Sequence, residues 1–466
     1  MDQYHPGRED LERFAGGDVF AHERRKIEDH LRSGCRSCQR MIDEMLPGLD
    51  EACLDLDLDL DFGEELEEPD WQESADLDFA FAKLEQRMAL ISLERNAAPR
   101  LVNELLRHPA GDRLQLVRSS RRFQTLAVCD LLIEKSFEEG FREPGCSVEI
   151  TELAIEVAGQ LDSGYYGKSV VQDLKARAWA YLGNARRIGS DFIGAEQAFL
   201  MAELLSEDGS ADPLEEARIL DLKASLLSDQ GWFEQAAELL DEVIDIYDDV
   251  KEHHRKGRAA ISKGLFLGYA GWAEKAIHLL QDGLALIDWD REPRLVLMAR
   301  HNLAWFLNDC GRCPEALQQL ERFRHSYREF PDAWTELRLL WLEGRIAGNL
   351  GRGEEAETAL RKVQQRFVEQ GLGYDASMVT LDLASLYLRQ GRSEEVKELA
   401  SAMFPIFVSQ DVHRQAIAAL AVFQQAAEMD VATASLVEEI TSYLLRARKN
   451  PKLIFSQSAK VRQQWK

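Results

Sequence analysis

The stretch ILDLKASLLSDQGWFEQAAELLDEVIDI (219–246) has the pattern of a helix, a tight turn and a second helix. Its first half carries leucines at helical spacing and one small residue, Ala224, which lets a partner helix approach closely. Gly231 follows, where a left-handed residue can close the last helical turn without steric cost. The second half begins with polar residues and buries Ala236 and Leu240. The stretch therefore predicts a helical hairpin.

The same frame recurs every forty residues. A turn glycine is preceded by a small residue seven positions earlier and followed by two apolar columns, five and nine positions later. The columns are Gly231, Gly271, Gly311, Gly351 and Gly391; Ala224, Gly264, Ala304, Gly344 and Ala384; Ala236, Ala276, Ala316, Ala356 and Val396; and Leu240, Leu280, Leu320, Leu360 and Ala400. An earlier unit, slipped by one residue, holds Gly183, Asp191, Ala195 and Phe199. One hairpin cannot bury its own apolar faces, so stacked copies are expected.

This frame resembles the tetratricopeptide repeat family, and the resemblance covers residues 166–430. The family unit is near 34 residues, whereas these units have 40, which longer helices would explain. The resemblance implies an all-α, tetratricopeptide-like helical superhelix. It says little about function, because such arrays bind protein partners of every kind.

The amino-acid composition limits the classes of function that the chain can have. The 466 residues carry a formal net charge of −26, which disfavours direct binding to nucleic acid and suits a basic protein partner. Seven cysteines, an odd number, argue against a disulfide framework and for a reducing cytoplasm. No apolar stretch is long enough to span a membrane, and no charged-then-apolar signal segment opens the chain.

Charge is unevenly placed along the chain. Residues 47–78 hold fourteen acids and no base, and after Glu439 there are seven bases and no acid. The acidic segment is interpreted as a self-repelling linker, or as one that pairs in extended form or folds on a basic partner. Its alternating stretch supplies the expected partner-binding residues Asp55, Leu56, Asp57, Leu58, Asp59, Leu60 and Asp61. The basic end is a solvated tail, or docks on the acidic linker or on nucleic acid.

The first 46 residues contain a metal-ligand pattern. His30, Cys35 and Cys38 form H-x4-C-x2-C, and two residues between sulfurs suit tetrahedral zinc. A closed structural site needs a fourth ligand, for which His5 and His22 are the candidates. The alternative is a helical hairpin with incidental cysteine and histidine.

The order of these residues resembles the zinc-binding domain of bacterial anti-sigma factors. That family has an upstream ligand, a helix, an acidic turn, a second helix and then histidine and a Cys-x2-Cys pair. His5, the turn AGGDV (15–19), His30, Cys35 and Cys38 match it in order, with one extra residue in Ser33-Gly34. The resemblance implies a structural Zn²⁺ held by His5, His30, Cys35 and Cys38, and a bacterial sigma factor as partner.

Other motifs carry less chemistry. Cys310 and Cys313 form a second Cys-x2-Cys pair, but they flank the repeat turn at Gly311 and are interpreted as turn residues rather than a disulfide switch. The packing of the repeats explains every candidate pair of a nucleophile and a base in the sequence. We therefore expect a binding protein and not an enzyme, although an enzyme with an unrecognised site stays open.

These observations predict five regions: a zinc-binding domain (1–46), an acidic linker (47–78), a helical region that can hold degenerate repeats (79–165), the repeat array (166–445) and a basic tail (446–466). Two functions are weighed. The first is a cytoplasmic bacterial regulator that binds and inhibits a sigma factor through the acidic segment and the zinc-binding domain, here called the zinc head. In this function the repeat array acts as sensor or docking platform. The second is a repeat scaffold for complex assembly, in which zinc is purely structural.

Overall fold

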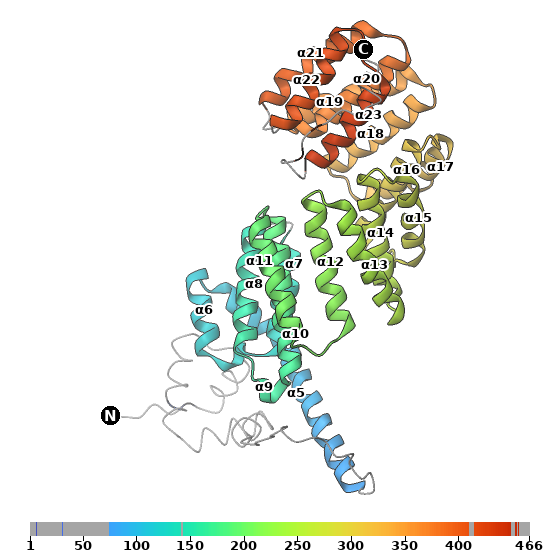
Figure 1. Cartoon of the computed structure of the whole chain (residues 1–466). Helices are drawn as coiled ribbons and strands as arrows, with labels where there is room; N and C mark the ends of the chain where they lie inside the picture. The colour runs from blue at the N-terminus through green and yellow to red at the C-terminus, as the bar shows by residue number, and fades with distance from the viewer. Residues whose placement is uncertain are drawn as a thin grey trace. The chain divides into compact units, whose positions relative to one another are not determined.

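The computed structural model describes residues 74–140, 143–409 and 414–448, together with Pro6, His30, Leu453 and Phe455. Within these ranges the chain forms α-helices and two short 3-10 helices, with no strand, which confirms the all-α repeat fold (Figure 1). The chain divides into the compact units Met1–Lys83 and Leu84–Lys466, and the repeats lie within the second. No helix in the described ranges is long and apolar enough to cross a membrane.

The helices of the second unit pair into successive hairpins. The first helices of the hairpins are α7 (Leu126–Gly140), α10 (Lys168–Ile188), α12 (Pro213–Asp229), α14 (His253–Tyr269), α16 (Pro293–Asp309), α18 (Ala333–Asn349), α20 (Gly373–Arg389) and α22 (Arg414–Glu428). The second helices are α8 (Pro144–Gly159), α11 (Phe192–Ser206), α13 (Phe233–Asp249), α15 (Ala273–Leu286), α17 (Cys313–Phe323), α19 (Gly353–Glu369), α21 (Ser393–Ser409) and α23 (Ala434–Ala447). The other elements are α5 (Ser74–Arg107), α6 (Ala110–Ser119), η1 (Arg121–Phe123), α9 (Ser163–Tyr166) and η2 (Arg324–Glu329).

The glycine column ends the first helices as the sequence predicts. All five glycines have positive φ, between 70° at Gly391 and 96° at Gly271. At Gly231, the glycine amide donates to the carbonyl of Ser228 and the next amide donates to that of Leu227, at 3.0 and 2.8 Å. This pair of bonds is a Schellman motif, which satisfies carbonyls that the helix end would leave without partners.

The small-residue column lies where two helices approach closely. A Cβ built at Gly264 would stand 3.1 Å from Leu280, and one at Gly344 would stand 3.1 Å from Leu360. The leucine column therefore packs directly onto the small-residue column, as predicted. In the slipped unit, Gly183 leaves room for the ring of Phe199 in the same way.

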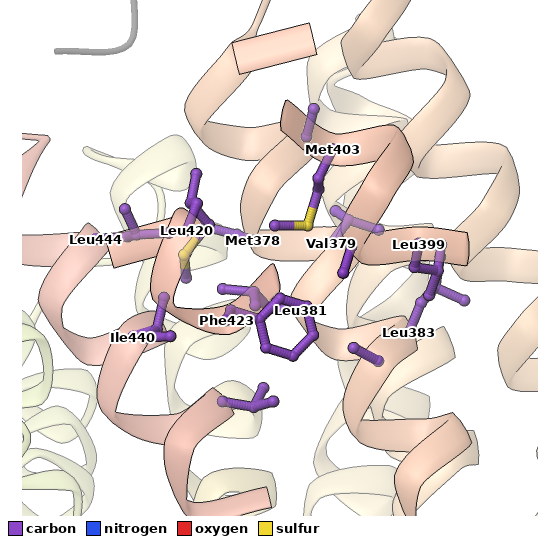
Figure 2. Close-up of a cluster of buried hydrophobic side chains, with 14 of the residues drawn as sticks. Met378, Val379, Leu381, Leu383, Leu399, Met403, Leu420, Phe423, Ile440 and Leu444 are labelled. Carbon is purple, nitrogen blue, oxygen red and sulfur yellow. The ribbon is translucent and has the colours of Figure 1, made fainter. Parts of the chain in front are cut away.

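Buried side chains form several successive cores along the array. The C-terminal core runs from α18 to α23, and Figure 2 shows Val379, Leu399, Phe423 and Ile440 among its side chains. Separate cores lie at α10 to α12, and at α12 to α14. Each hairpin thus depends mainly on its neighbours, as expected for a repeat array.

The last helix departs from this neighbour-to-neighbour pattern. α23 packs against α20 as well as against its hairpin partner α22, and it also touches α14. Arg448 lies 2.9 Å from the buried carboxylate of Asp375 in α20. Arg446 reaches 3.7 Å from Glu234, at the start of α13. The C-terminal helix therefore contacts hairpins that lie far from it in sequence.

A charged network ties α19 to the turn after α20. Glu357 accepts hydrogen bonds from Arg392 at 2.7 Å, from Arg361 at 3.0 Å and from the hydroxyl of Tyr387 at 2.6 Å. The bond from Arg392, followed by that from Tyr387, lowers the pKa of Glu357 to about 2. The ionised carboxylate is thus the form that stabilises this joint.

Glu357→Gln should therefore destabilise the joint at neutral pH and remove part of its acid sensitivity. Because folding lowers the pKa of Glu357, its contribution is fully present above the unfolded value of about 4.3 and is lost as the pH falls through about 2. We expect a loss of about 1–2 kcal/mol at pH 7, allowing for partial solvent screening. Denaturation of both proteins at pH 7, 4 and 2.5 measures this. Equal pH profiles would contradict the network.

Candidate partner-binding face

Three successive first helices line an open pocket of about 330 Å³. α10 packs against α7 on one side and against α12 on the other. The apolar lining consists of Ile133 and Phe137 from α7 and Tyr181 from α10. The rings of Phe137 and Tyr181 meet edge to face, with centroids 6.2 Å apart. The pocket thus lies on the face formed by the first helices, which we call the first-helix face.

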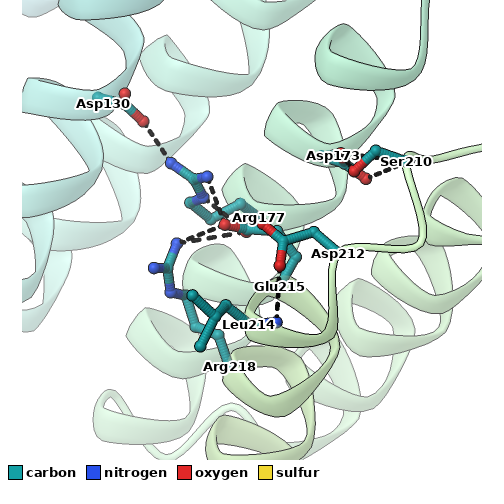
Figure 3. Close-up of polar contacts among 8 residues, drawn as sticks. All are labelled: Asp130, Asp173, Arg177, Ser210, Asp212, Leu214, Glu215 and Arg218. Atoms are coloured by element: carbon teal, nitrogen blue, oxygen red, sulfur yellow. Dashed lines mark hydrogen bonds and ion pairs between the residues drawn. The ribbon is translucent and has the colours of Figure 1, made fainter. Parts of the chain in front are cut away.

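Arg177 is the centre of the polar side of this pocket (Figure 3). Its guanidinium donates to Asp130 of α7 at 2.5 Å and holds Glu215 of α12 through two bonds, at 2.8 and 2.5 Å. Arg218 donates to the same Glu215 carboxylate at 3.1 Å. Burial would lower the pKa of Arg177, but the hydrogen bonds to Glu215 and the charge of Asp130 outweigh it and raise the pKa. One arginine therefore joins three first helices.

The start of α12 places Glu215 correctly. Asp212 caps the helix by accepting from the amide of Leu214 at 2.9 Å, and Pro213 occupies the first helical position, where no amide donor is needed. The preceding loop is fixed to α10, because Asp173 accepts from the amide of Ser210 at 3.0 Å. Figure 3 shows both contacts beside the Arg177 cluster. Local capping thus orients the carboxylate that Arg177 binds.

An arginine recurs at this position of the repeat, six residues before the small-residue column. The position holds Arg177, Arg218, Arg258 and Arg338, with Met298 and Met378 in two other repeats. Arg258 lies 3.4 Å from Glu292. Burial of His301 has the larger effect, and the positive charge of Arg338 adds to it; together they lower the pKa of His301 well below its ordinary value. We call these four residues the arginine column. The column was not among the predicted functional residues, although it recurs within the forty-residue frame.

The rim of the pocket is acidic. Glu134 and Glu138 lie four residues apart on α7, line the pocket and are exposed. With Asp130 they give three acids against the two lining bases, Arg177 and Arg218. Because Arg177 is already held by two carboxylates, the charge available to a partner at this pocket is negative. The arrangement suits a segment with basic and apolar side chains.

A second polar cluster lies further along the first helices. Arg345 of α18 lies 3.0 Å from Asp309 of α16 and 3.2 Å from Asp382 of α20. Its guanidinium stacks 4.1 Å from the ring centre of Trp305, and the indole of Trp341 donates to Asp382 at 2.7 Å. This cluster mirrors the Arg177 cluster, since one arginine again joins three first helices. Its charges satisfy one another, so it holds the array together.

The predicted zinc site and acidic segment fall almost wholly outside the described residues. His5, His22, Cys35 and Cys38 lie there, as do residues 55–61. His30 is described, as a half-buried helical residue. Among the described residues, no group of histidine, cysteine or carboxylate side chains could hold a metal ion. The four-ligand site therefore stays a prediction.

The second Cys-x2-Cys pair flanks the turn at Gly311. Cys310 caps the end of α16, and Cys313 is buried in the first turn of α17. Burial, followed by the charge of Glu274, raises the pKa of Cys310 to about 11. A thiol is reactive as the thiolate, so this environment is the opposite of that of a redox cysteine. The geometry favours the interpretation as turn residues.

Comparisons with known proteins agree with the repeat fold. The family description "Tetratricopeptide repeat" matches residues 296–329, which run from α16 to η2. No curated protein matches the chain. A solved Rap protein complexed with competence and sporulation factor is 12% identical, with a TM-score of 0.51, and the match covers 67% of this chain and 85% of that one.

A second similar structure is aspartyl phosphate phosphatase F from Bacillus subtilis, at 14% identity and a TM-score of 0.48. That match covers 88% of this chain and 96% of the other. At 12% identity, the likeness to the Rap protein structure concerns the fold alone. Within the described residues from Leu126 to Ala447, the helices form an array of tetratricopeptide-like hairpins.

Proposed function

We propose that this chain is a regulatory repeat protein that binds a segment of a protein partner in the pocket between α7, α10 and α12. The observation that carries the proposal is the pocket itself. Its apolar side, formed by Ile133, Phe137 and Tyr181, adjoins two exposed carboxylates, Glu134 and Glu138. An apolar side chain can be buried there while a neighbouring basic side chain meets the rim.

Two further points support binding. The pocket lies on a rigid base, because the Arg177 cluster joins its three helices. A solved array of similar fold is a Rap protein complexed with competence and sporulation factor, so this kind of scaffold can hold a second molecule. The partner of this chain is defined by its chemistry, a segment with basic and apolar residues. We propose binding rather than catalysis, in the cytoplasm.

The test begins with affinity purification from the native host, which identifies the partner. Glu134→Lys with Glu138→Lys should then weaken its binding at least about tenfold, because the rim charge reverses. Phe137→Ala should weaken it through lost apolar contact. The matched control is Glu238→Lys with Glu242→Lys, an exposed pair with the same spacing on α13. A partner that binds the rim variant and the control equally would overturn the pocket assignment.

The sequence supports a second candidate, in which the head binds a bacterial sigma factor and inhibits it. His5, His30, Cys35 and Cys38 occur in the order of the anti-sigma zinc domain, and an acidic segment follows them. Under this proposal the residues hold one structural Zn²⁺, and residues 55–61 attract and then pack against the sigma factor. The repeat array acts as sensor or docking platform.

Zinc content tests the head in the full-length chain. Protein purified without chelator should contain one zinc per chain, and Cys35→Ser with Cys38→Ser should remove it. Cys310→Ser with Cys313→Ser is the matched control, since it changes the other Cys-x2-Cys pair and should leave zinc unchanged. The zinc-free variant should also lose sigma-factor binding. A wild-type chain without zinc, or sigma-factor binding that survives in the double variant, would reject this role of the head.

A further inference from the structure

The outward face of α11 is largely apolar and exposed. Ile193, Leu200 and Leu204 are 73, 57 and 49% exposed, and Met201 beside Leu200 is 38% exposed. The spacing of 193, 200 and 204 is seven and four residues, which places these side chains along one side of a helix. Gln197, which is also exposed, lies next to them. The four apolar residues form a stripe about 17 Å long, which we call the α11 stripe.

The repeat fold does not require this stripe. Ala195 of α11 and Ala236 of α13 share one column, so each residue of α11 has an equivalent forty-one positions later. The equivalents of Ile193, Leu200, Met201 and Leu204 are Glu234, Asp241, Glu242 and Asp245. All four apolar positions of the stripe are thus acidic in the next second helix. The same structural place is therefore charged in α13 and apolar in α11.

One edge of the stripe is acidic. At about 100° per residue, Glu196, Glu203 and Glu207 lie within about 60° of Leu200, all on the same side of it. Glu196 and Glu207 are exposed, and Glu203 is half-buried and paired with Lys223. The opposite edge is uncharged, because Gln197 and Met201 form it. The surface therefore has a direction: apolar in the middle and negative along one side.

We propose that the α11 stripe is a docking site for an amphipathic helix of a partner protein, with lysine or arginine along one side of its apolar stripe. Four apolar residues over three turns match a partner helix of similar length, as in other helix-in-groove recognition. The acidic edge fixes the orientation, because only one direction places basic residues against Glu196, Glu203 and Glu207. This site is separate from the pocket on the first-helix face.

Charge disfavours a second copy of the chain as the occupant. If two α11 helices paired across a two-fold axis in the antiparallel direction, the acidic edge of one would face the same edge of the other. The net charge of −26 adds general repulsion. A lipid surface is disfavoured as well, since membrane-surface helices carry basic residues beside the apolar face.

Synthetic helices test the site on the full-length chain. Three labelled peptides are designed as one amphipathic helix, with apolar residues spaced as in the α11 stripe. They differ only along one side of their apolar residues, which carries lysine, glutamine or glutamate. Fluorescence anisotropy should rank their affinities as lysine, then glutamine, then glutamate. Equal affinity for all three peptides would refute the acidic edge.

The decisive variant gives α11 the residues of α13: Ile193→Glu, Leu200→Asp and Leu204→Asp. These charges would attract the lysine peptide, so a loss of at least tenfold in its affinity can come only from lost apolar contact. The matched control is Gln281→Asp, Gln318→Glu and Thr358→Glu, which adds the same charge at exposed positions of three other second helices. The control should bind as the wild type does. Undiminished binding by the α11 variant would overturn the proposal.

Three more measurements separate the alternatives. Glu196→Gln with Glu207→Gln should bring the affinities for the lysine and glutamine peptides together, and an unchanged gap would contradict the edge. Sedimentation should show a monomer, and a dimer that the α11 variant abolishes would assign the stripe to self-association. Anionic vesicles should not bind, and binding that the α11 variant removes would assign the stripe to membranes.

Discussion

Gly283→Ala should be among the most damaging single changes in the array. A Cβ at this position would stand 2.7 Å from the backbone carbonyl of Gly257 and 3.0 Å from the amide of Ile261. Backbone atoms of a helix cannot turn aside as a flexible side chain can, so α14 and α15 must separate. We expect a loss of about 2–3 kcal/mol in unfolding free energy, at the upper end of the overpacking range.

The control for this change is Gly159→Ala. Gly159 ends α8, and no atom lies within 4 Å of a Cβ built there. The added methyl should be neutral or slightly stabilising, since alanine favours a helix and restricts the unfolded chain. Denaturation, with hydrogen exchange of α14 and α15, compares the two variants. If Gly283→Ala and Gly159→Ala melt together, the close approach of α14 and α15 is wrong.

Arg177→Met should loosen the joint between α7, α10 and α12. It leaves the buried carboxylate of Glu215 with Arg218 alone and removes the partner of Asp130. Removing one member of a buried ion pair costs more than the pair contributes, because the remaining charge is still desolvated. We expect about 2–3 kcal/mol of destabilisation, less than for a fully isolated pair, since Arg218 remains.

A double-mutant cycle distinguishes this explanation from simple loss of packing. Arg177→Met combined with Glu215→Met should recover most of the lost stability, because no unpaired buried carboxylate is left between α10 and α12. Arg366→Met, which breaks an exposed pair with Glu369, should change stability by less than about 0.5 kcal/mol. Hydrogen exchange of α10 and α12 localises the effect. Additive losses in the double variant would argue against the ion-pair explanation.

The part of the fold that depends on local sequence could be predicted. Positive φ at Gly231 follows from the residue type and its place after a helical pattern. The small-residue column, such as Gly344 against Leu360, follows from the forty-residue frame. Both features involve residues within a single hairpin, so the period is sufficient to place them.

Features that depend on how hairpins stack could not be predicted in the same way. Arg448 pairs with Asp375, seventy-three residues away, because α23 packs back against α20. The joining of Asp130 and Glu215 by Arg177 likewise depends on the packing of three first helices. The α11 stripe can be found in the sequence only when α11 is compared with α13 position by position. The zinc ligands stay a prediction, since His5, Cys35 and Cys38 lie outside the described residues.

The return of α23 has a mechanical consequence. A row of hairpins that touch only their neighbours can lengthen elastically, through small rotations between each hairpin and the next. The contact between Arg446 and Glu234 connects the last helix to the start of α13, and α23 also touches α14. The hairpins between α13 and α23 are thus part of one closed ring of contacts. Opening a joint between α13 and α23 therefore also strains the packing of α23 against α14 and α20. The hairpins before α12 lie outside this ring of contacts, and there the Arg177 cluster holds α7, α10 and α12 together instead.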